Sequence, residues 1–340
     1  TAEARSWSLN WWQKGIFTLE KIISLENLLR AWNLFRKGKR TRSDVMVFER
    51  HLEDNIFDIQ EALAEGSYRH GSYEPFTIHD PKQRTIHKAT VQDRLVHQAV
   101  VNVIEPLFEK RFIYDSYSCR VGKGTHAAIA RLRGFLREMS WNDTRTVHAL
   151  KCDIRKFFAS VDQAVLSELL KRRVHDPQTL GLLRHIIESF STVPGKGIPL
   201  GNLTSQLFAN VYLHELDRYI KHDLHIHHYV RYCDDFVILV RSKAEAARLV
   251  ERIDAFLRGR LKVELHPNKI HIRTWTQGVD FLGYVLMPHA TILRPQTARR
   301  MIGRVSGSNQ SSYLGLCGHA STHDLRRLIF NKIIDGSDGA

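Results

Sequence analysis

Residues 229–240, YVRYCDDFVILV, decide the fold of this chain. Two apolar runs flank an adjacent pair of acids, Asp234 and Asp235, so the pattern predicts a buried β-hairpin with two carboxylates at its turn. A third acid, Asp153, ends another apolar run upstream. Carboxylates in an apolar hairpin are costly unless cations neutralise them, and a pair of Mg²⁺ ions held by fixed oxygens suits nucleotidyl transfer. The alternative is an ordinary Asp-Asp turn at the surface.

The composition fits a globular protein with a polyanionic partner. The chain has 340 residues, of which 43% are hydrophobic, so it can form a real core with two or three subdomains. Its 50 Lys and Arg against 36 Asp and Glu give a net charge of +14. That excess is more than solubility needs and points to nucleic acid.

The remaining compositional signals predict a cytoplasmic protein without a membrane partner. The four cysteines are far apart, without metal-type spacing, as in a reduced cytosolic protein. No apolar run approaches the roughly 20 residues that span a bilayer, and no signal peptide is recognisable. Because the chain begins at Thr1 rather than Met, the sequence leaves open whether either end is truncated.

The periodicity predicts a helical start. Apolar residues between Val45 and Leu63 recur at helical spacing, which indicates one helix with one buried face, and Gly66-Ser67 should end it. A second helix is predicted from Asp93 to Lys110, with these residues facing inward: Leu95, Val96, Ala99, Val103, Ile104 and Leu107.

Strand-like stretches follow around residues 76–78, 84–86, 146–154, 262–272 and 279–286, and another helix is expected over 243–258. Asp162 is a plausible N-cap for the helix after the 146–154 strand. Gly195-Lys196-Gly197 is predicted to be a flexible turn rather than a phosphate cradle, and residues 306–309 a flexible joint.

Seven sequence blocks now stand in a recognisable order. They are Arg84–Leu95, SYSCR at 116–120 with GKGTH at 122–126, DIRKFF at 153–158, LGNLTSQ at 200–206, YCDD at 232–235, HPNK at 266–269 and FLGY at 281–284. In this order they resemble the blocks of bacterial reverse transcriptases of the group II intron and retron superfamily. The nearest resemblance is to the enzymes of diversity-generating retroelements, because the fourth of these blocks begins with Leu200-Gly201 rather than Gln-Gly.

The resemblance implies an α+β right-hand polymerase fold with fingers, a palm made of an antiparallel sheet plus helices, and a helical thumb. On that basis we expect an N-terminal helical extension at residues 1–70, fingers at 71–148, a palm at 149–290 with a finger insertion at about 165–200, and a thumb at 291–340, whose completeness the sequence leaves open.

The resemblance also implies the metal site. Asp153, Asp234 and Asp235, with the backbone carbonyl of Ile154, would hold two Mg²⁺ ions, for which Mn²⁺ is a possible substitute. Lys269 would act beside them as a charge stabiliser or proton donor to the departing pyrophosphate. The competing view of Lys269 is a solvated strand lysine.

Other residues would bind substrate by the same resemblance. Phe158 would exclude a 2′-hydroxyl from the nucleotide site, although a core phenylalanine is the alternative, and Arg84 would hold the triphosphate, with Lys82 and Lys88 as alternatives. Leu200 cannot donate the hydrogen bond of a glutamine amide, which implies relaxed fidelity opposite template adenine. The other substrate-binding candidates are Gly201, Ser205, Gln206 and Arg120, and the primer-grip candidates are Phe281, Leu282, Gly283 and Tyr284.

The implied function is an RNA-directed DNA polymerase that makes cDNA from a structured RNA. The implied partners are the template RNA, an RNA–DNA hybrid and dNTPs, together with a small basic oligomeric accessory protein in the diversity-generating group. Mutagenic retrohoming is the leading role. An antiphage enzyme that copies a noncoding RNA is the alternative, and a maturase-like RNA-binding protein is the alternative outside enzymes.

Overall fold

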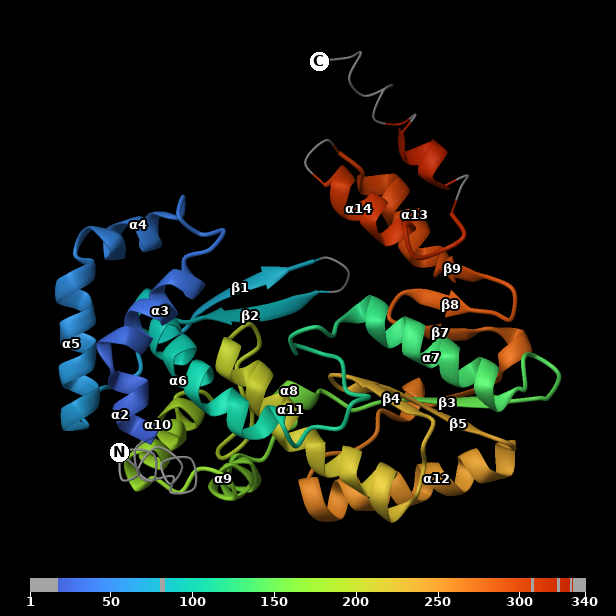
Figure 1. Cartoon of the computed structure of the whole chain (residues 1–340), viewed down its shortest axis with the longest axis horizontal. Coiled ribbons are helices and arrows are strands. Elements are labelled where there is room, and N and C mark those ends of the chain that lie inside the picture. Colours follow the sequence, from blue (N-terminus) through green and yellow to red (C-terminus); the bar gives the residue numbers. More distant parts are fainter. Residues whose placement is uncertain (1–17, 80–82, 307–308, 323–324, 331, 333–340) are drawn as a thin grey trace, which may run out of the picture. The chain divides into compact units, whose positions relative to one another are not determined.

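The chain folds into two compact units, each assembled from separated stretches of sequence (Figure 1). A computed structural model describes residues 18–79, 83–306, 309–322, 325–330 and 332. Unit 1 comprises Thr1–Ile113, Arg155–Leu216 and Phe256–Glu264, and unit 2 comprises Tyr114–Ile154, Asp217–Ala255 and Leu265–Ala340. The division into four parts expected from the sequence stays a prediction.

Unit 1 is mostly helical and carries one two-stranded hairpin. The antiparallel hairpin pairs β1 (Glu74–Ile78) with β2 (Arg84–Lys88). Its helices are α2 (Thr18–Ile23), α3 (Leu25–Phe35), α4 (Ser43–Arg50), α5 (Leu52–Glu65), α6 (Val91–Glu109), α8 (Phe157–Ser160), α9 (Gln163–Lys171), α10 (Pro177–Glu188) and α11 (Leu203–Arg218, whose last two residues belong to unit 2). Asp162 caps α9 as predicted, because its side chain accepts a hydrogen bond from Val165 N at 3.0 Å.

Two helix predictions need correction. The single helix expected across Val45–Leu63 is two helices, α4 and α5, which meet at His51, where φ is −121° and ψ 40°. No Gly or Pro marks this break, and apolar residues continue on both sides of it, so the periodicity hides it. In α6, Leu107 was expected to face inward but is exposed. Gly66 ends α5 as expected, with φ at 72° in the left-handed region.

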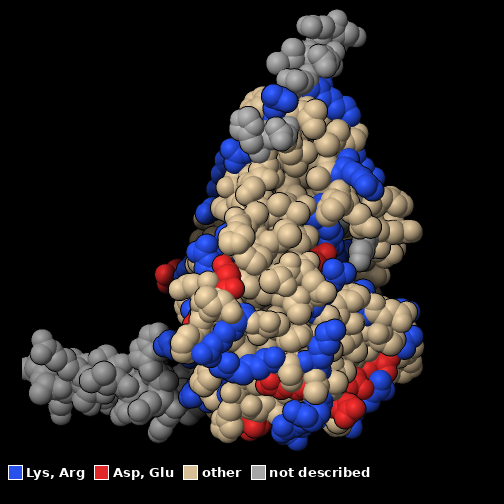
Figure 2. All heavy atoms as spheres, turned by 90° about the vertical axis from the view of Figure 1, so that its right-hand side faces the viewer, with Lys and Arg blue, Asp and Glu red and all other residues tan. Residues whose placement is uncertain are grey.

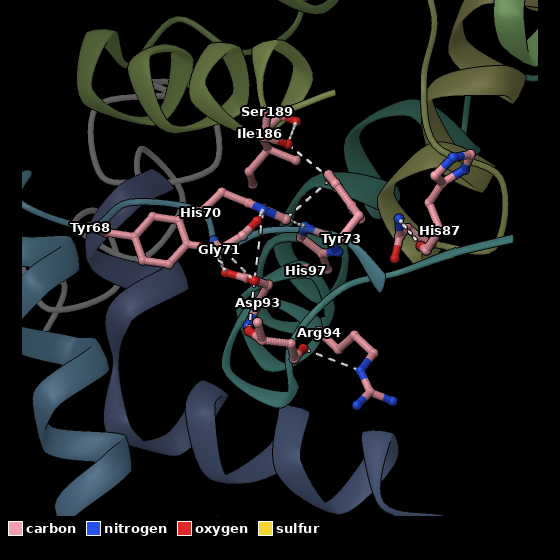
Figure 3. A network of polar contacts seen from close by, with 12 residues as sticks. Tyr68, His70, Gly71, Tyr73, His87, Asp93, Arg94, His97, Ile186 and Ser189 are labelled. Carbon is pink, nitrogen blue, oxygen red and sulfur yellow. Dashed lines mark hydrogen bonds and ion pairs between the residues drawn. The ribbon is translucent and has the colours of Figure 1, made fainter. Parts of the chain in front are cut away.

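A buried polar network joins the base of the hairpin in unit 1 to α6 and α10. Asp93, at the start of α6, accepts hydrogen bonds from Tyr68 Oη at 2.7 Å and from the Gly71 amide at 3.2 Å (Figure 3). His70 Nε2 and His97 Nε2 are 3.2 Å apart, and the backbone amide of His70 donates to His185 Nε2 at 2.9 Å. The network therefore fixes the segment that enters β1.

Unit 2 is built on a four-stranded antiparallel sheet with the order β4-β5-β3-β6. The strands are β3 (His148–Asp153), β4 (Tyr229–Tyr232), β5 (Asp235–Val240) and β6 (His271–Thr274). Helix α7 (Thr125–Met139) packs on one face of the sheet, and α12 (Lys243–Phe256) lies on the other side (Figure 1). Because both faces are covered, β5 is buried from Phe236 to Val240 instead of alternating.

A second, three-stranded sheet in unit 2 joins β7 (Val279–Phe281), β8 (Tyr284–Leu286) and β9 (Thr291–Leu293). Helices α13 (Pro295–Arg304) and α14 (Gln310–Cys317) follow it. The strand expected over residues 262–272 is confined to β6, because a 3₁₀ turn at Pro267–Lys269 interrupts it. The joint expected at residues 306–309 lies partly outside the described residues.

The surface is basic. Lys and Arg side chains are spread widely over the face shown in Figure 2, in keeping with the net charge of +14. Among the described residues, no helix combines the length and the apolar character that crossing a bilayer requires.

Candidate active site

The β4–β5 hairpin of unit 2 carries two of the three predicted acids at its turn. Tyr232 pairs with Asp235, so Cys233 and Asp234 form a two-residue turn. Cys233 has φ at 55°, in the left-handed region where such turns usually place glycine. The tight turn fixes the direction of both carboxylates, and strained backbone of this kind is typical of functional sites.

The third acid lies on the neighbouring strand. Asp153, the last residue of β3, pairs directly with Asp235 in the antiparallel register, and the Ile154 amide donates to the Asp234 carbonyl at 3.2 Å. Strand pairing therefore brings Asp153 and Asp235 face to face, where like charges are destabilising. The carbonyl of Ile154, predicted as a further metal ligand, belongs to this same strand end.

Two lysines accompany the carboxylates. Lys269 Nζ lies 2.8 Å from Asp153 Oδ1, so the predicted lysine does contact the acidic cluster. Lys151 Nζ lies 3.4 Å from Asp235 Oδ2 and 3.7 Å from an oxygen of Asp280. Nothing in the sequence patterns had marked Lys151, although a lysine two residues before Asp153 in an antiparallel strand should face the same way.

Burial and mutual repulsion shift the acids toward their protonated forms. Burial raises the pKa of Asp235 to about 6, helped by Asp153 and Asp234 and opposed by Lys151. Burial, and next the charge of Asp153, also raises the pKa of Asp234. One oxygen of Asp235, Oδ1, is buried without a hydrogen-bond partner in the described part of the chain. A buried carboxylate oxygen of this kind is normally satisfied by a partner such as a cation.

The donor set suits a hard divalent cation. Carboxylate and carbonyl oxygens are the ligands that Mg²⁺ and Mn²⁺ prefer, and the unsatisfied oxygen of Asp235 supports such an ion. Among the described residues, however, no three His, Cys, Asp or Glu side chains are already gathered as a complete metal-binding group. The two-metal site therefore stays a prediction, with Asp153, Asp234 and Asp235 as its ligands.

A buried ion pair supports the turn from behind. The Arg231 guanidinium makes two hydrogen bonds to the carboxylate of Asp217, at 2.7 and 2.6 Å, and both side chains are fully buried. Arg231 also donates to the carbonyl of Cys233 at 3.1 Å, inside the turn, and Tyr229 Oη donates to Asp217 at 2.7 Å. The signal overlooked in the sequence was an arginine inside an apolar strand, because such an arginine requires a buried acidic partner.

The other predicted residues of unit 2 are mainly bound to their own surroundings. Arg120 donates to the carbonyl and hydroxyl of Ser116, at 2.8 and 2.7 Å, and so stabilises its own loop. Phe281 and Tyr284 pair across a two-residue turn formed by Leu282 and Gly283, which both have positive φ. The roles predicted for these residues in gripping template and primer stay predictions.

The remaining predicted residues lie in unit 1. Arg84 is exposed at the start of β2, Phe158 is half-buried beside the buried Phe157, and Lys82 lies outside the described residues. The Leu200 carbonyl accepts a hydrogen bond from the His87 amide of β2 at 3.1 Å. Gly201 has φ at 108°, and a Cβ there would lie 2.6 Å from Ile86.

Close packing against β2 thus requires glycine at position 201. The last two candidates follow on α11, where Ser205 is buried and Gln206 is half-buried.

Comparisons with known proteins show what the chain as a whole is similar to. A family model described as "Reverse transcriptase (RNA-dependent DNA polymerase)" matches residues 78–286. Protein YkfC of Escherichia coli (strain K12) is 26% identical over 263 residues, which cover 64% of this chain and 68% of that protein. The group II intron-encoded protein LtrA of Lactococcus lactis subsp. cremoris is 23% identical over 303 residues, which cover 68% of this chain and 49% of LtrA.

A solved structure has a similar fold. The apo telomerase of Candida tropicalis, truncated from its C-terminal domain, matches with a TM-score of 0.50 and 10% sequence identity. The match covers 72% of this chain and 60% of that one. At this identity the likeness concerns the fold alone, and the chain spans only about half the length of LtrA.

Proposed function

The chain belongs to the reverse transcriptase (RNA-dependent DNA polymerase) family, and from that premise we propose that the complete protein copies an RNA template into DNA. The observation that carries the proposal is the pairing of Asp153 with Asp235 at adjacent strand ends, with Asp234 in the connecting turn. Members of this family are nucleotidyl-transferring enzymes, and an acidic cluster of this kind is what their chemistry uses.

The acidic residues would bind the cations of the reaction. When bound, two Mg²⁺ ions activate the primer 3′-hydroxyl and stabilise the leaving pyrophosphate. Asp153 and Asp235 are directly paired on adjacent strands, so together with Asp234 they would hold the ions. Lys269, at 2.8 Å from Asp153, is placed to add positive charge or a proton as the pyrophosphate departs.

Primer extension on an RNA template, with dNTPs and Mg²⁺, tests the proposal. We expect extension by the full-length protein and only background extension by the Asp234→Asn/Asp235→Asn variant. RNA binding by the variant, measured by fluorescence anisotropy, should match that of the unchanged protein. Extension by the variant at the unchanged rate would overturn the proposed catalytic role.

We further propose that the enzyme is error-prone and serves mutagenic retrohoming of a diversity-generating retroelement. The support is Leu200, which has no amide to hydrogen-bond at the position where related enzymes carry glutamine. A small basic oligomeric accessory protein would be its partner. Near-identical DNA repeats beside the gene, differing mainly at adenines, would favour this role. A lone noncoding RNA gene would favour antiphage defence instead.

A maturase-like RNA-binding role is the second candidate. The similarity to the group II intron-encoded protein LtrA, together with the net charge of +14, favours it. The same aspartate variant separates the two functions, because an RNA-binding role should survive the loss of both carboxylates while polymerisation should not.

A further inference from the structure

Unit 1 contains a basic cavity that none of the predicted catalytic residues lines. Its volume is about 600 Å³. Four cationic side chains line it, together with one carboxylate: Lys156, Lys196, Arg258, Lys262 and Glu264. They come from the segment that enters α8, from the turn at Gly195–Gly197 and from residues 258–264. The fold thus gathers positive charge here from three separate stretches of sequence.

Among the residues that line the cavity, the acidic one, Glu264, is already paired with arginines. Glu264 already binds two arginines, Arg155 at 2.7 Å and Arg258 at 2.8 Å. Within the described part of the chain, Lys262 Nζ donates to the Gly259 carbonyl, at 3.1 Å, and to no carboxylate. The ammonium groups of Lys156 and Lys196 make no hydrogen bond or ion pair with any described residue. Like charges gathered at a concave surface attract anions, because a ligand of opposite sign relieves the repulsion between them.

Two of these lysines have an uncommon backbone conformation. Lys156 has φ at 44° and Lys262 has φ at 54°, both in the left-handed region where glycine is the favoured residue. Lys196 stands between two glycines of positive φ, and its turn is held by the hydrogen bonds Lys196 N to Val193 O and Thr192 N to Lys196 O, each 2.9 Å. The side chains of these three lysines therefore extend from backbone of defined conformation.

We propose that this cavity is a binding site for phosphate groups outside the polymerase site, and that the phosphates belong to an RNA backbone or to a free polyphosphate. Lysine is a compact point charge that suits phosphate oxygens of either source. The volume, about 600 Å³, exceeds that of one phosphate group. The proposal goes beyond the polymerase function, and it gives Lys196 a role in place of the simple flexible turn expected from the sequence.

The test uses the full chain in EDTA, so that polymerisation cannot occur. The variant Lys156→Gly/Lys196→Gln/Lys262→Gly removes three cations, and because glycine suits the two left-handed positions its unliganded melting temperature should not fall. Lys171→Gln, which removes an exposed cation of α9 outside the cavity, is the matched control. Binding of a labelled RNA hairpin is measured against salt concentration, and melting is measured with and without sodium tripolyphosphate.

We expect the triple variant to bind the hairpin about tenfold or more weakly, with the slope of log affinity against log salt reduced by about 2 to 3. The control should match the unchanged protein. If only the stabilisation by tripolyphosphate is lost, the source is a free polyphosphate. If RNA affinity, salt slope and tripolyphosphate stabilisation all stay as in the unchanged protein, the proposal is overturned.

Discussion

Asp235 shows how a single residue can serve the site at the expense of the fold. It faces Asp153 across the sheet, and one of its oxygens has no hydrogen-bond partner among the described residues. Its pKa is raised to about 6 by burial, so the folded state holds its proton more tightly than the unfolded state does. The carboxylate therefore contributes stability at low pH and loses that contribution as the pH rises through about 6.

Replacing Asp235 by Asn should stabilise the metal-free protein at pH 8. The gain in the free energy of unfolding should be on the order of 2 kcal/mol, because the buried charge is removed. Chemical unfolding in EDTA measures this gain. Added Mg²⁺ should raise the melting temperature of the unchanged protein but not that of Asp235→Asn. A variant that is less stable than the unchanged protein at pH 8 would contradict this account of Asp235.

A second single residue, Leu200, bears on the proposed error rate. Its backbone is fixed by the hydrogen bond from His87, and Gly201 packs closely on Ile86. Replacing Leu200 by Gln should therefore add an amide without moving the chain, and misincorporation opposite template adenine should fall by up to about tenfold, which corresponds to about 1.4 kcal/mol of discrimination. Sequencing of cDNA measures this, with Leu200→Met as the control. An unchanged error spectrum would remove the support for relaxed fidelity.

At the scale of elements, the β4–β5 hairpin depends on the buried pair of Arg231 and Asp217. The pair holds the carbonyl of Cys233 and so fixes the turn that carries Asp234. A buried ion pair of this kind adds little net stability, because desolvation offsets its attraction, but breaking one half of it is costly. We infer that the pair positions the turn.

Stability and activity should separate when this pair is replaced. Arg231→Met alone should lower the free energy of unfolding by about 3–5 kcal/mol. The variant Arg231→Met/Asp217→Leu/Tyr229→Phe should recover most of that loss, since neither the Asp217 carboxylate nor the Tyr229 hydroxyl is left buried without a partner. Primer extension should stay low in both variants, because the Cys233 carbonyl has lost its donor. Full activity in the triple variant would show that the pair has no positioning role.

The individual helices and strands show what the sequence could and could not predict. The β4–β5 hairpin, α6 and the Asp162 cap depend on local patterns, so they were predicted correctly. The break at His51 and the outward turn of Leu107 depend on packing between helices, which no local pattern records. In the site, Lys269 was expected beside the acids from the family resemblance. Lys151 was not expected, because its contact depends on how the strands pair.

At the scale of the whole molecule, the two units should respond to acid in opposite directions. In unit 1, burial next to His70 lowers the pKa of His97 to about 3, so stability is present above the unfolded pKa near 6.5 and is lost as the pH falls below it. In metal-free unit 2, the raised pKa of Asp235 gives stability that increases as the pH falls through about 6.

Hydrogen exchange between pH 7 and pH 5, in EDTA, should therefore show α6 losing protection by about 1–2 kcal/mol relative to its value at pH 7. Strands β3 and β5 should keep or gain protection over the same range. His97→Gln should flatten the pH dependence of α6 and leave that of β5 unchanged. Equal loss of protection in both units would contradict the separate origins of the two effects.

The pairing of Asp153 in β3 with Asp235 in β5 also predicts how such genes change once their product is no longer used. A neutral side chain at position 153 or 235 would relieve the repulsion between the two acids, so the proposed catalytic role is what would keep both of them in place. In gene copies that decay after losing their template, these two codons should therefore drift before those of the surrounding apolar strands. A survey of degenerate copies would show the order in which the losses occurred.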